Sequence, residues 1–398
     1  MKKILFIGAG EFQIDGIRRA NELGFHTIAI DGDSEAVGKI EADEFYNINV
    51  KCNNEILELA RDNMVDGCVA IASEVSMGAM AYVNSKMGLN GYPSELIEIA
   101  HDKKKYYSLF EKNKIKVPKT IVFKDNGALA KLDKNKSYII KPSKGSGSRG
   151  VKRSNNIHNF NFDDYHIAYI GKEEEIIIQE LIIGKEMTVD GFIIDKNFHL
   201  LAVSEEMNDL EKGYTFSSEL VFPPEWIEPK NYKNIVAICN QVVDSLNINC
   251  TGPMHLEFIL TPDGEYFIID FSLRGGGFDV FTKIIEKTSN VNILDLYILS
   301  SLGEEVPSPI TTHFNPVTLS FLYPEKAGKI KKINGIELEG KHKDYYLKFL
   351  HSVNMYISEP ESGKQRYAYF ICWGKNYQDI FKRRAWVKEQ ISLEIDDE

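Results

Sequence analysis

The stretch from residue 252 to residue 277 restricts the fold most strongly, because it has the pattern of a β-hairpin that runs into an arginine and three glycines. The apolar residues at every second position are Leu256, Phe258, Leu260, Phe267, Ile269 and Phe271, and they alternate with Glu257, Ile259, Ile268, Asp270 and Ser272. A period of two is typical of strands with one buried face. Pro262-Asp263-Gly264 is a turn signal between the runs. The segment therefore predicts two antiparallel strands.

Burial sets the register of this hairpin, because a slip of one residue would turn every side chain to the other face. Leu256 opposite Phe271 keeps the apolar sets together and places Glu257 opposite Asp270. We expect no bulge that shifts this register, since it would oppose phenylalanines to acids. Opposed Cβ atoms lie roughly 5 Å apart, so two carboxylates there repel each other. With Ser272 on the same face, they favour a divalent cation, because Mg²⁺ takes oxygen ligands.

The residues after the hairpin, Arg274-Gly275-Gly276-Gly277, argue against the simpler interpretation that the acids are the solvated face of an edge hairpin. Consecutive glycines suit a backbone that approaches a ligand closely. We expect His255, just before the acids, to lie on the apolar side of its strand in a structural role.

Composition limits the class of protein. The chain has 398 residues, of which 43% are hydrophobic, and a formal net charge of −11. The length predicts two or three domains. An acidic chain is a poor non-specific partner for nucleic acid. Five scattered cysteines without CxxC or metal spacing favour a reducing cytoplasm. No run approaches the ~18 apolar residues of a membrane span, and the run Ile4–Ile7 is too short for a signal peptide.

The N-terminal part alternates strands and helices with short links, which predicts a parallel sheet with right-handed crossovers. The expected elements are strands Lys3–Ile7, His26–Ile30 and Gly67–Ile71 and helices Asp15–Leu23, Glu55–Asp62 and Ser94–Phe110, the last broken near His101-Asp102. Gly8-Ala9-Gly10, with Asp31 after the second strand, is a weak dinucleotide-binding fingerprint, because Gln13 replaces its third glycine. We favour a turn that lines a substrate carboxylate over a nicotinamide site. A turn that only lets the strand and the helix pack is the simpler alternative.

A phosphate-binding loop is predicted where strands Thr120–Phe123 and Tyr138–Lys141 are followed by the glycine–serine stretch Ser143–Gly150. Lys141, Lys144 and Arg149 gather positive charge there, and the glycines and serines expose donors to phosphate oxygens. The loop is not a Walker loop, because no Gly-Lys-Ser/Thr opens a helix. A flexible surface linker is the alternative.

Further strands, helices and one irregular stretch are expected downstream. These are strands Ile176–Gln179 and Glu186–Ile194, an irregular stretch Glu205–Pro224, helix Tyr232–Leu246 and a largely helical segment Val280–Leu302. After the boundary at Pro307-Ser308-Pro309, strands Val317–Leu322 and Tyr367–Trp373 and helix Tyr377–Lys388 suggest a small α+β unit.

In this order, the segments resemble the ATP-grasp superfamily over nearly the whole chain. The motifs that carry the resemblance are Asp102-Lys103, Lys141 with its glycine–serine loop, Gln179-Glu180-Leu181-Ile182 with Gly184 and Glu186, and Glu257 with Asp270, Ser272 and the Arg274 glycine run. The resemblance implies an α/β and α+β fold: a Rossmann-like pre-ATP-grasp domain at 1–100, a two-lobed ATP-grasp domain at 101–310 with a mobile lid at about 120–185, and a C-terminal α+β domain at 311–398.

The resemblance also assigns roles to single residues. The residues implied to contact ATP are Lys103, Lys141, Ser146, Gly147, Ser148, Gly150, Glu180, Leu181, Ile182 and Glu186. Glu257, Asp270 and Ser272 are the implied ligands of Mg²⁺ or Mn²⁺, while Arg274, Gly275 and Gly276 are implied to contact substrate, and Arg274 and Lys141 to act in catalysis. The family usually has glutamate at position 270 and asparagine at position 272, so metal occupancy or geometry is expected to differ here.

The layout is most similar to that of L-amino-acid (dipeptide) ligases and related carboxylate–amine ligases. It implies an enzyme that transfers the γ-phosphoryl of ATP to a carboxylate, and an amine then attacks the acyl phosphate to form an amide with release of ADP and phosphate. The implied partners are a small carboxylate and a small amine, without nucleic acid or membrane, and a homodimer is common in similar enzymes. A carboxylase that uses bicarbonate, a non-catalytic nucleotide-binding regulator and a nicotinamide-dependent oxidoreductase remain alternatives.

Overall fold

The computed structural model describes residues 1–123, 129, 132–145, 147, 149–169, 175–208, 216–307, 314–360 and 363–396. Its strands are β1 (Lys3–Ile7), β2 (His26–Asp31), β3 (Glu44–Asn47), β4 (Gly67–Val69), β5 (Thr120–Phe123), β6 (Tyr138–Pro142), β7 (Lys152–Ser154), β8 (Ile176–Glu180), β9 (Lys185–Ile194), β10 (Asn197–Asn208), β11 (Ser217–Phe222), β12 (Gly252–Leu260), β13 (Tyr266–Ser272), β14 (Val317–Leu322), β15 (Gly328–Asn334), β16 (Gly340–Lys341), β17 (Tyr345–Phe349), β18 (Tyr356–Ile357), β19 (Ala368–Trp373) and β20 (Ser392–Ile395). Its α-helices are α1 (Ile14–Glu22), α2 (Asn53–Asp62), α3 (Glu74–Met87), α4 (Ser94–Ala100), α5 (Lys103–Lys112), α7 (Phe162–Tyr169), α8 (Pro229–Ser245), α9 (Ile285–Ser289), α10 (Ile293–Ser301) and α11 (Tyr377–Gln390). No helix of these described ranges is both long enough and apolar enough to cross a membrane.

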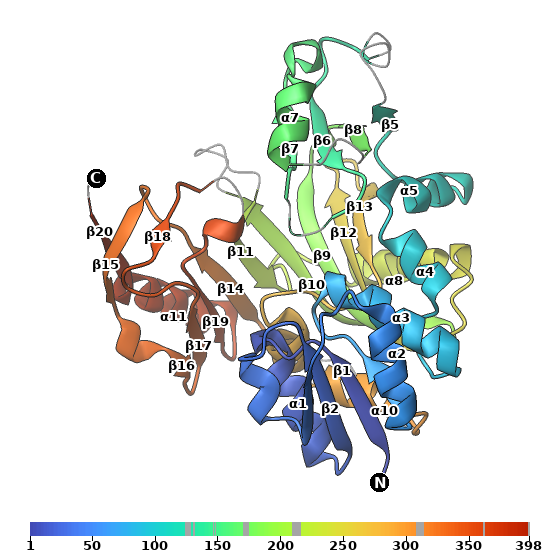
Figure 1. The fold of residues 1–398 in the computed structure, drawn as a ribbon. Helices are drawn as coiled ribbons and strands as arrows, with labels where there is room; N and C mark the ends of the chain where they lie inside the picture. The colour runs from blue at the N-terminus through green and yellow to red at the C-terminus, as the bar shows by residue number, and fades with distance from the viewer. Residues whose placement is uncertain are drawn as a thin grey trace.

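The N-terminal sheet is parallel in the order β3-β2-β1-β4, as the alternating pattern predicted. Strand β1 is an apolar run that is buried almost throughout, which is typical of a parallel strand covered on both faces. Helix α10, from far along the chain, packs against helix α1 and strand β4. Arg19 of α1 pairs with Asp295, and the Tyr297 hydroxyl lies 3.4 Å from the carbonyl oxygen of Ala70, just after β4. The N-terminal unit is therefore anchored to the middle of the chain (Figure 1).

The largest sheet has nine strands in the order β13-β12-β9-β10-β11-β14-β19-β17-β16. Its ladders are antiparallel and join the central part of the chain to its C-terminal part through β11 and β14. A separate three-stranded sheet, β18-β15-β20, lies at the C-terminal edge of the molecule (Figure 1). The large sheet thus continues across residue 310, where the sequence pattern placed a domain boundary.

A smaller sheet, β5-β8-β6-β7, forms a lobe at the top of Figure 1 together with α7. Its core is separate from the main one and consists of Leu129, Tyr138, Ile140, Ile157, Phe162, Tyr165, Ile176 and Ile178. Helix α5 precedes this lobe and begins after a break at residues 101–102, as predicted. The break occurs because the Asp102 carboxylate caps α5 by accepting hydrogen bonds from the Lys104 and Lys105 amides.

The predicted hairpin is correct next to the acids and wrong near its turn. Glu257 lies opposite Asp270, but Phe258 lies opposite Ile268, so a bulge at Ile269 shifts the register by one residue. Beyond the bulge, Ile268 and Tyr266 face the core in place of the expected Ile269 and Phe267. No phenylalanine of the described hairpin lies opposite an acid, because the register changes only in the half of the hairpin that is next to the turn.

The described parts of the stretch Glu205–Pro224 are less irregular than expected, and residues 209–215 lie outside the described residues. The beginning of the stretch extends β10 as far as Asn208, and Ser217–Phe222 forms β11 in the middle of the large sheet. Residues 217–222 form a strand because β11 has a partner on each side: β10 and β14. The local sequence pattern does not reveal β14, which lies almost 100 residues later in the chain.

Candidate functional site

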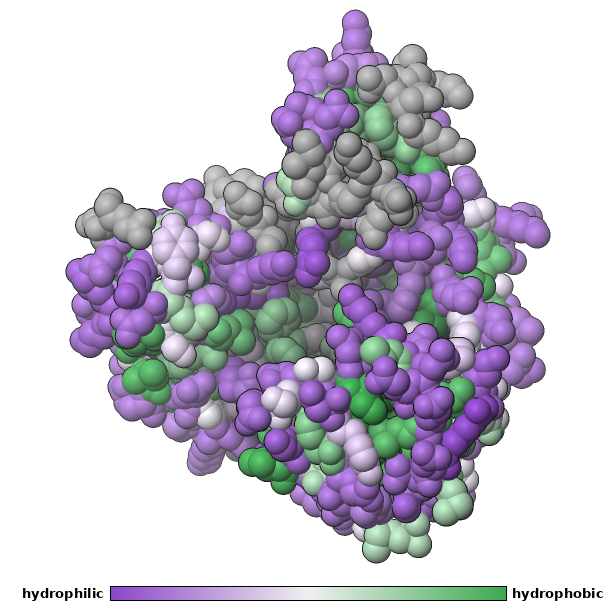
Figure 2. All heavy atoms as spheres, in the orientation of Figure 1, coloured by the Kyte–Doolittle hydropathy of each residue, from purple (hydrophilic) through white to green (hydrophobic). Residues whose placement is uncertain are grey.

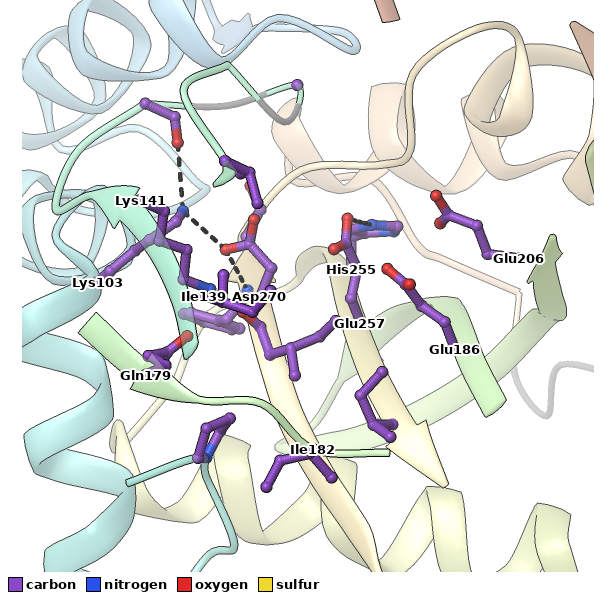
Figure 3. A pocket seen from close by; sticks show the side chains of 18 of the residues that line it. Lys103, Ile139, Lys141, Gln179, Ile182, Glu186, Glu206, His255, Glu257 and Asp270 are labelled. Carbon is purple, nitrogen blue, oxygen red and sulfur yellow. Dashed lines mark hydrogen bonds and ion pairs between the residues drawn. The ribbon is translucent and has the colours of Figure 1, made fainter. Parts of the chain in front are cut away.

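A cavity of about 700 Å³ lies between the small lobe and the large sheet, and the molecular surface is hollowed there (Figure 2). It is lined by many charged side chains, and two groups of them face each other. We call four of the acids on the large sheet the acidic wall: Glu186, Glu206, Glu257 and Asp270. We call four of the cations on α5 and the small lobe the basic wall: Lys103, Lys141, Lys144 and Arg149. Glu205 and Lys185 of the large sheet and Arg153 of the small lobe also line the cavity. Lys103 and Lys141 lie on one side of the close-up view, and Glu186, Glu206 and Glu257 lie on the other (Figure 3).

Two lysines of the basic wall, Lys103 and Lys141, contact strand β13 on the other side of the cavity. Lys103 places Nζ 2.9 Å from Asp270 Oδ1 and donates to the Gly145 carbonyl oxygen at 3.2 Å. The Tyr106 hydroxyl donates to the same Asp270 oxygen at 2.7 Å. Burial alone would raise the pKa of Asp270, but the charges of Lys103 and Lys141 outweigh it and hold that pKa well below its usual range.

Lys141 is buried, and the bulge in the hairpin provides its partner. Its Nζ donates to the Ile269 carbonyl oxygen and to the Tyr107 hydroxyl, both at 2.9 Å. The Ile269 carbonyl is available because the bulge takes this residue out of the ladder with β12. Burial lowers the pKa of Lys141, against the opposing effect of Asp270 and Glu257. The register shift that the sequence did not predict thus positions the lysine that it did predict.

The hinge between β8 and β9 forms another part of the cavity lining. Glu180, Leu181 and Ile182 all line it, and so do Ile259 and Ile269 of the hairpin. The Glu180 carboxylate is paired with Lys136 of the small lobe, and the Leu181 amide donates to the Ser137 carbonyl oxygen at 3.0 Å. This arrangement supplies an apolar slot beside a carboxylate.

Glu186 and Glu206 are acids on neighbouring strands, β9 and β10. The Asn208 amide donates to Glu186 at 3.1 Å, and the Ser217 hydroxyl donates to Glu206. Burial and the nearby charge of Glu257 raise the pKa of Glu186 to about 7. Burial and the charge of Glu186 raise the pKa of Glu206 well above its usual value. Glu206 lies in the stretch where the sequence offered no assignment.

Arg274 is held by an acid from the N-terminal unit. Its Nε lies 2.6 Å from Glu74 Oε2, and the Ser272 hydroxyl donates to the same oxygen at 3.2 Å. His101 Nε2 lies 2.9 Å from the other oxygen, Oε1. Burial would raise the pKa of Glu74, but His101 and Arg274 outweigh it and lower that pKa to about 2. Glu74 is at the start of α3, so only the fold brings it to this cavity.

Two glycines after Arg274 are required by close packing. A Cβ on Gly275 would lie 1.8 Å from a ring carbon of Phe281, and one on Gly276 would lie 3.0 Å from the Val280 side chain. Neither residue lines the cavity in this structure, although Arg274 does. The glycines thus have a packing reason besides the close approach to a ligand that the sequence suggested.

The expectation that His255 lies on the apolar side of its strand is wrong. His255 lines the cavity, with Nδ1 3.0 Å from Asp190 Oδ1 and Nε2 3.6 Å from Glu257 Oε1. Burial opposes protonation, but Asp190 and Glu257 outweigh it and raise the pKa of His255 to about 10. The period-two pattern already held this information, since His255 is two residues from Glu257 and must share its face.

The structure brings most of the predicted site residues together. Those that line the cavity are Lys103, Lys141, Gly147, Glu180, Leu181, Ile182, Glu186, Glu257, Asp270, Ser272 and Arg274. Gly150 is buried, and its carbonyl oxygen accepts a hydrogen bond from the Tyr165 hydroxyl. Ser146 and Ser148 lie outside the described residues. Glu74, Glu206 and His255 are cavity residues that the sequence did not indicate.

The N-terminal glycine turn has a structural explanation. Asp31 accepts hydrogen bonds from the amides of Ala9 at 2.9 Å and Asp33 at 3.0 Å, one on each carboxylate oxygen. The Gln13 side chain donates to the Ile71 carbonyl oxygen at 2.6 Å. Asp31 is the acid that would bind the ribose of a nicotinamide cofactor, and both of its carboxylate oxygens already accept hydrogen bonds from backbone amides.

The donor set fits magnesium held jointly with phosphate oxygens. Among the described residues, no group of three or more His, Cys, Asp or Glu side chains could hold a metal ion. Mg²⁺ is commonly bound by one or two carboxylates together with substrate phosphates. The directly opposed Glu257 and Asp270 supply two carboxylates with the lysines of the basic wall facing them.

Comparison with known proteins agrees with this geometry. Residues 100–272 match the model of the ATP-grasp domain, so the predicted resemblance is confirmed for this part of the chain. The chain is 30% identical over 182 residues to a D-alanine–D-alanine ligase of Rickettsia typhi, covering 45% of this chain and 55% of that protein. It therefore spans about half the length of this relative.

Two solved structures share the fold over essentially the whole chain. The L-amino acid ligase from Bacillus licheniformis superposes with a TM-score of 0.86 at 16% identity, covering 100% of this chain and 99% of that one. An ADP complex of N5-carboxyaminoimidazole synthetase from Staphylococcus aureus superposes with a TM-score of 0.73 at 14% identity, covering 97% and 96%. The predicted α/β and α+β fold is thereby confirmed, and the ATP-grasp domain is matched over residues 100–272.

Proposed function

Because the chain contains an ATP-grasp domain, we propose that it is an ATP-dependent carboxylate–amine ligase that forms an amide through an acyl phosphate and releases ADP and phosphate. The observation that carries this proposal is the opposition of Glu257 and Asp270 across the hairpin, facing Lys103 and Lys141 with Arg274 beside them. Phosphoryl transfer needs positioning and charge neutralisation more than covalent help from the protein. A cavity with one basic and one acidic wall supplies both.

The proposed roles follow from position in the cavity. Lys103 and Lys141 would contact the phosphates, with Gly147, Gly150 and the serines at 146 and 148 forming the loop over them. Glu180 and the backbone at Leu181 and Ile182 would hold adenine in the apolar slot, and Glu186 would accept hydrogen bonds from the ribose. Ser272, whose hydroxyl is engaged with Glu74 here, is the weakest proposed metal ligand.

Glu257 and Asp270 would hold Mg²⁺, which neutralises charge on the phosphate oxygens when bound. Lys103 now pairs with Asp270, so this lysine would turn from the carboxylate to the phosphates as nucleotide enters. Arg274, with Gly275 and Gly276 behind it, would face the transferred phosphoryl group and the oxyanion formed when the amine attacks. A donor of this kind is worth on the order of 3 kcal/mol.

The small lobe, residues of about 120–185, would act as a lid, because an acyl phosphate is lost if water reaches it. We retain 1–100, 101–310 and 311–398 as the proposed domains, with the large sheet joining the second to the third. A homodimer and a cytoplasmic location remain part of the proposal. The latter is supported by five cysteines that are all free.

The test is a phosphate-release screen across pairs of amino acids with Mg²⁺ and ATP. A ligase releases ADP and phosphate only when both an acid and an amine are present, and mass spectrometry then finds the amide. Incorporation of labelled bicarbonate would instead identify a carboxylase. Nucleotide binding without turnover across the screen would favour a regulator.

A further inference from the structure

We propose that Asp190 and His255 form an outer shell that fixes both the magnesium carboxylate Glu257 and the Arg274 loop, as positioning residues rather than catalytic ones. This inference rests on the proposed function, because it takes the Glu257–Asp270 pair as the place where Mg²⁺ is held with ATP. The argument uses contacts on β9, β12 and the loop after β13.

The first observation is the placement of these residues in adjacent rows of one sheet. His255 on β12 lies between Asp190 of β9 and Ser272 of β13. Glu257, two residues along, lies in the next row opposite Asp270. His255 therefore touches the acidic wall from the side, and Figure 3 shows its ring directed toward Glu257.

The second observation is the burial of Asp190. This side chain is 1% exposed, and within the described part of the chain its only ion-pair partner is His255, at 3.0 Å between Oδ1 and Nδ1. The other oxygen, Oδ2, has no hydrogen-bond partner among the described residues. A buried carboxylate is costly unless it is paired. His255 Nδ1 has no hydrogen-bond partner by geometry among the described residues either, so the 3.0 Å contact is an ion pair by distance. Asp190 thus faces the imidazole as its buried charge partner.

The third observation is that the same Asp190 oxygen holds the loop. The Gly276 amide donates to Asp190 Oδ1 at 2.8 Å. A Cβ on Gly276 would lie 3.2 Å from that oxygen, so glycine lets the backbone approach the carboxylate. Arg274 is two residues earlier. One buried oxygen thereby sets the position of the Arg274 backbone and, through His255, the orientation of Glu257.

The expected size follows from outer-shell residues at metal sites in general. Replacing such a residue typically costs roughly tenfold to a hundredfold in metal affinity. The loss should affect the magnesium dependence of nucleotide binding and not nucleotide binding as such, because neither Asp190 nor His255 belongs to the proposed adenine or ribose contacts.

The test measures binding of a non-hydrolysable ATP analogue by calorimetry at a series of Mg²⁺ concentrations. The variants are Asp190→Asn, which keeps an acceptor for Gly276 but loses the charge, His255→Asn, which keeps a donor near the Nδ1 position, and His255→Gln, which keeps one near the Nε2 position. His199→Gln, on β10 and outside the cavity lining, is the matched control.

We expect each of the three variants to need roughly ten to a hundred times more Mg²⁺ for half-maximal binding, while the control behaves as the parent protein. The double variant Asp190→Asn/His255→Gln should be no worse than the worse single variant, because both changes break one link. Melting temperatures check the fold, and the two His255 variants carry the test if Asp190→Asn does not fold.

Two results would overturn the inference while leaving the proposed function intact: parental magnesium dependence in either His255 variant, or losses that add in the double variant. If the parent protein does not bind the analogue at any Mg²⁺ concentration, the proposed function fails and the inference fails with it. A melting temperature that falls without a change in magnesium dependence also counts against it, since it describes a merely structural pair.

Discussion

The two walls of the cavity differ in charge, and they also differ in the secondary structure that carries them. The acidic wall stands on four neighbouring strands of a nine-stranded sheet that is part of the main core. The basic wall comes from α5 and a four-stranded lobe with a core of eight buried apolar side chains. Helix α5, which carries Lys103, packs with Tyr106, Tyr107 and Phe110 in the main core. The comparison teaches that the carboxylates and Lys103 are placed by an extended framework, while Lys141, Lys144 and Arg149 depend on how a small lobe docks against it.

Contacts between the walls support this interpretation. Lys103 reaches Asp270 and Lys141 reaches the Ile269 carbonyl oxygen, so both lysines contact β13. A substitution on the acidic wall should therefore remove chemistry without moving the framework. A substitution on the basic wall should also change how the lobe docks.

Glu257→Ala should have the largest effect. Loss of a metal carboxylate removes several kcal/mol of charge stabilisation, and each 1.4 kcal/mol is about tenfold, so ATP turnover should fall by about a thousandfold or more. Turnover is measured as ADP release with the substrates found in the screen. Glu265→Ala, near the turn of the same hairpin, is the matched control and should retain activity. Full activity of Glu257→Ala would refute metal binding by this residue.

Lys141→Ala should have the next largest effect. It should raise the KM for ATP or lower the rate of turnover by a factor on the order of a hundred, because it removes a charged donor at a phosphoryl group. It also removes the contact between the small lobe and the Ile269 carbonyl. Limited proteolysis should therefore cleave the small lobe faster than in the parent. Lys134→Ala, exposed on the same lobe, is the control. Unchanged kinetics would remove the phosphate role.

Glu186→Gln should change the pH dependence of stability. Burial and Glu257 raise the folded-state pKa of Glu186 to about 7, above its usual value of 4.5. The folded protein therefore binds this proton more tightly than the unfolded chain, and stability falls as pH rises between these two values.

The neutral glutamine escapes that loss, so the variant should gain on the order of 3 kcal/mol relative to the parent between pH 5 and pH 8.5. Denaturant unfolding without metal or nucleotide measures the difference. Charged groups that affect Glu186 from the neighbouring elements are Glu257, Glu206 and Lys141. Parallel pH profiles for the two proteins would contradict the perturbed titration.

Asp102→Ala should have the smallest effect, a loss of about 1 kcal/mol in the free energy of unfolding. The Asp102 carboxylate accepts hydrogen bonds from the first turn of α5, the helix that begins with Lys103. Asp102→Asn keeps the capping acceptor and should remain close to the parent. Equal losses in both variants would show that the charge of Asp102, rather than its cap, is what matters.

Sequence patterns predicted the parts of the site that depend on neighbours in the chain. The opposition of Glu257 to Asp270 followed from period-two burial, and the break before α5 followed from the residues around Asp102. Lys141 was correctly placed at the end of a strand beside a glycine-rich loop. Each of these is fixed by fewer than 30 consecutive residues.

What escaped prediction depends on distant partners. The bulge at Ile269 occurs where Lys141 and Tyr107, from outside the hairpin, hydrogen-bond to the freed carbonyl. Glu74 meets Arg274 across 200 residues of chain, and β11 is a central strand only because β14 pairs with it. His255 is the exception among the wrong predictions. It is two residues from Glu257, so the sequence alone predicts that both side chains lie on the same face of the strand.

The ladder between β11 and β14 has a consequence for any attempt to dissect this protein. A chain cut after residue 310 would leave β11 with a row of unsatisfied amide and carbonyl groups, in a strand rich in buried apolar side chains. An open edge of this kind pairs readily with copies of itself. The shortened protein should therefore aggregate. The last 88 or so residues protect the edge of the sheet that carries the carboxylates, because their strand β14 pairs with β11.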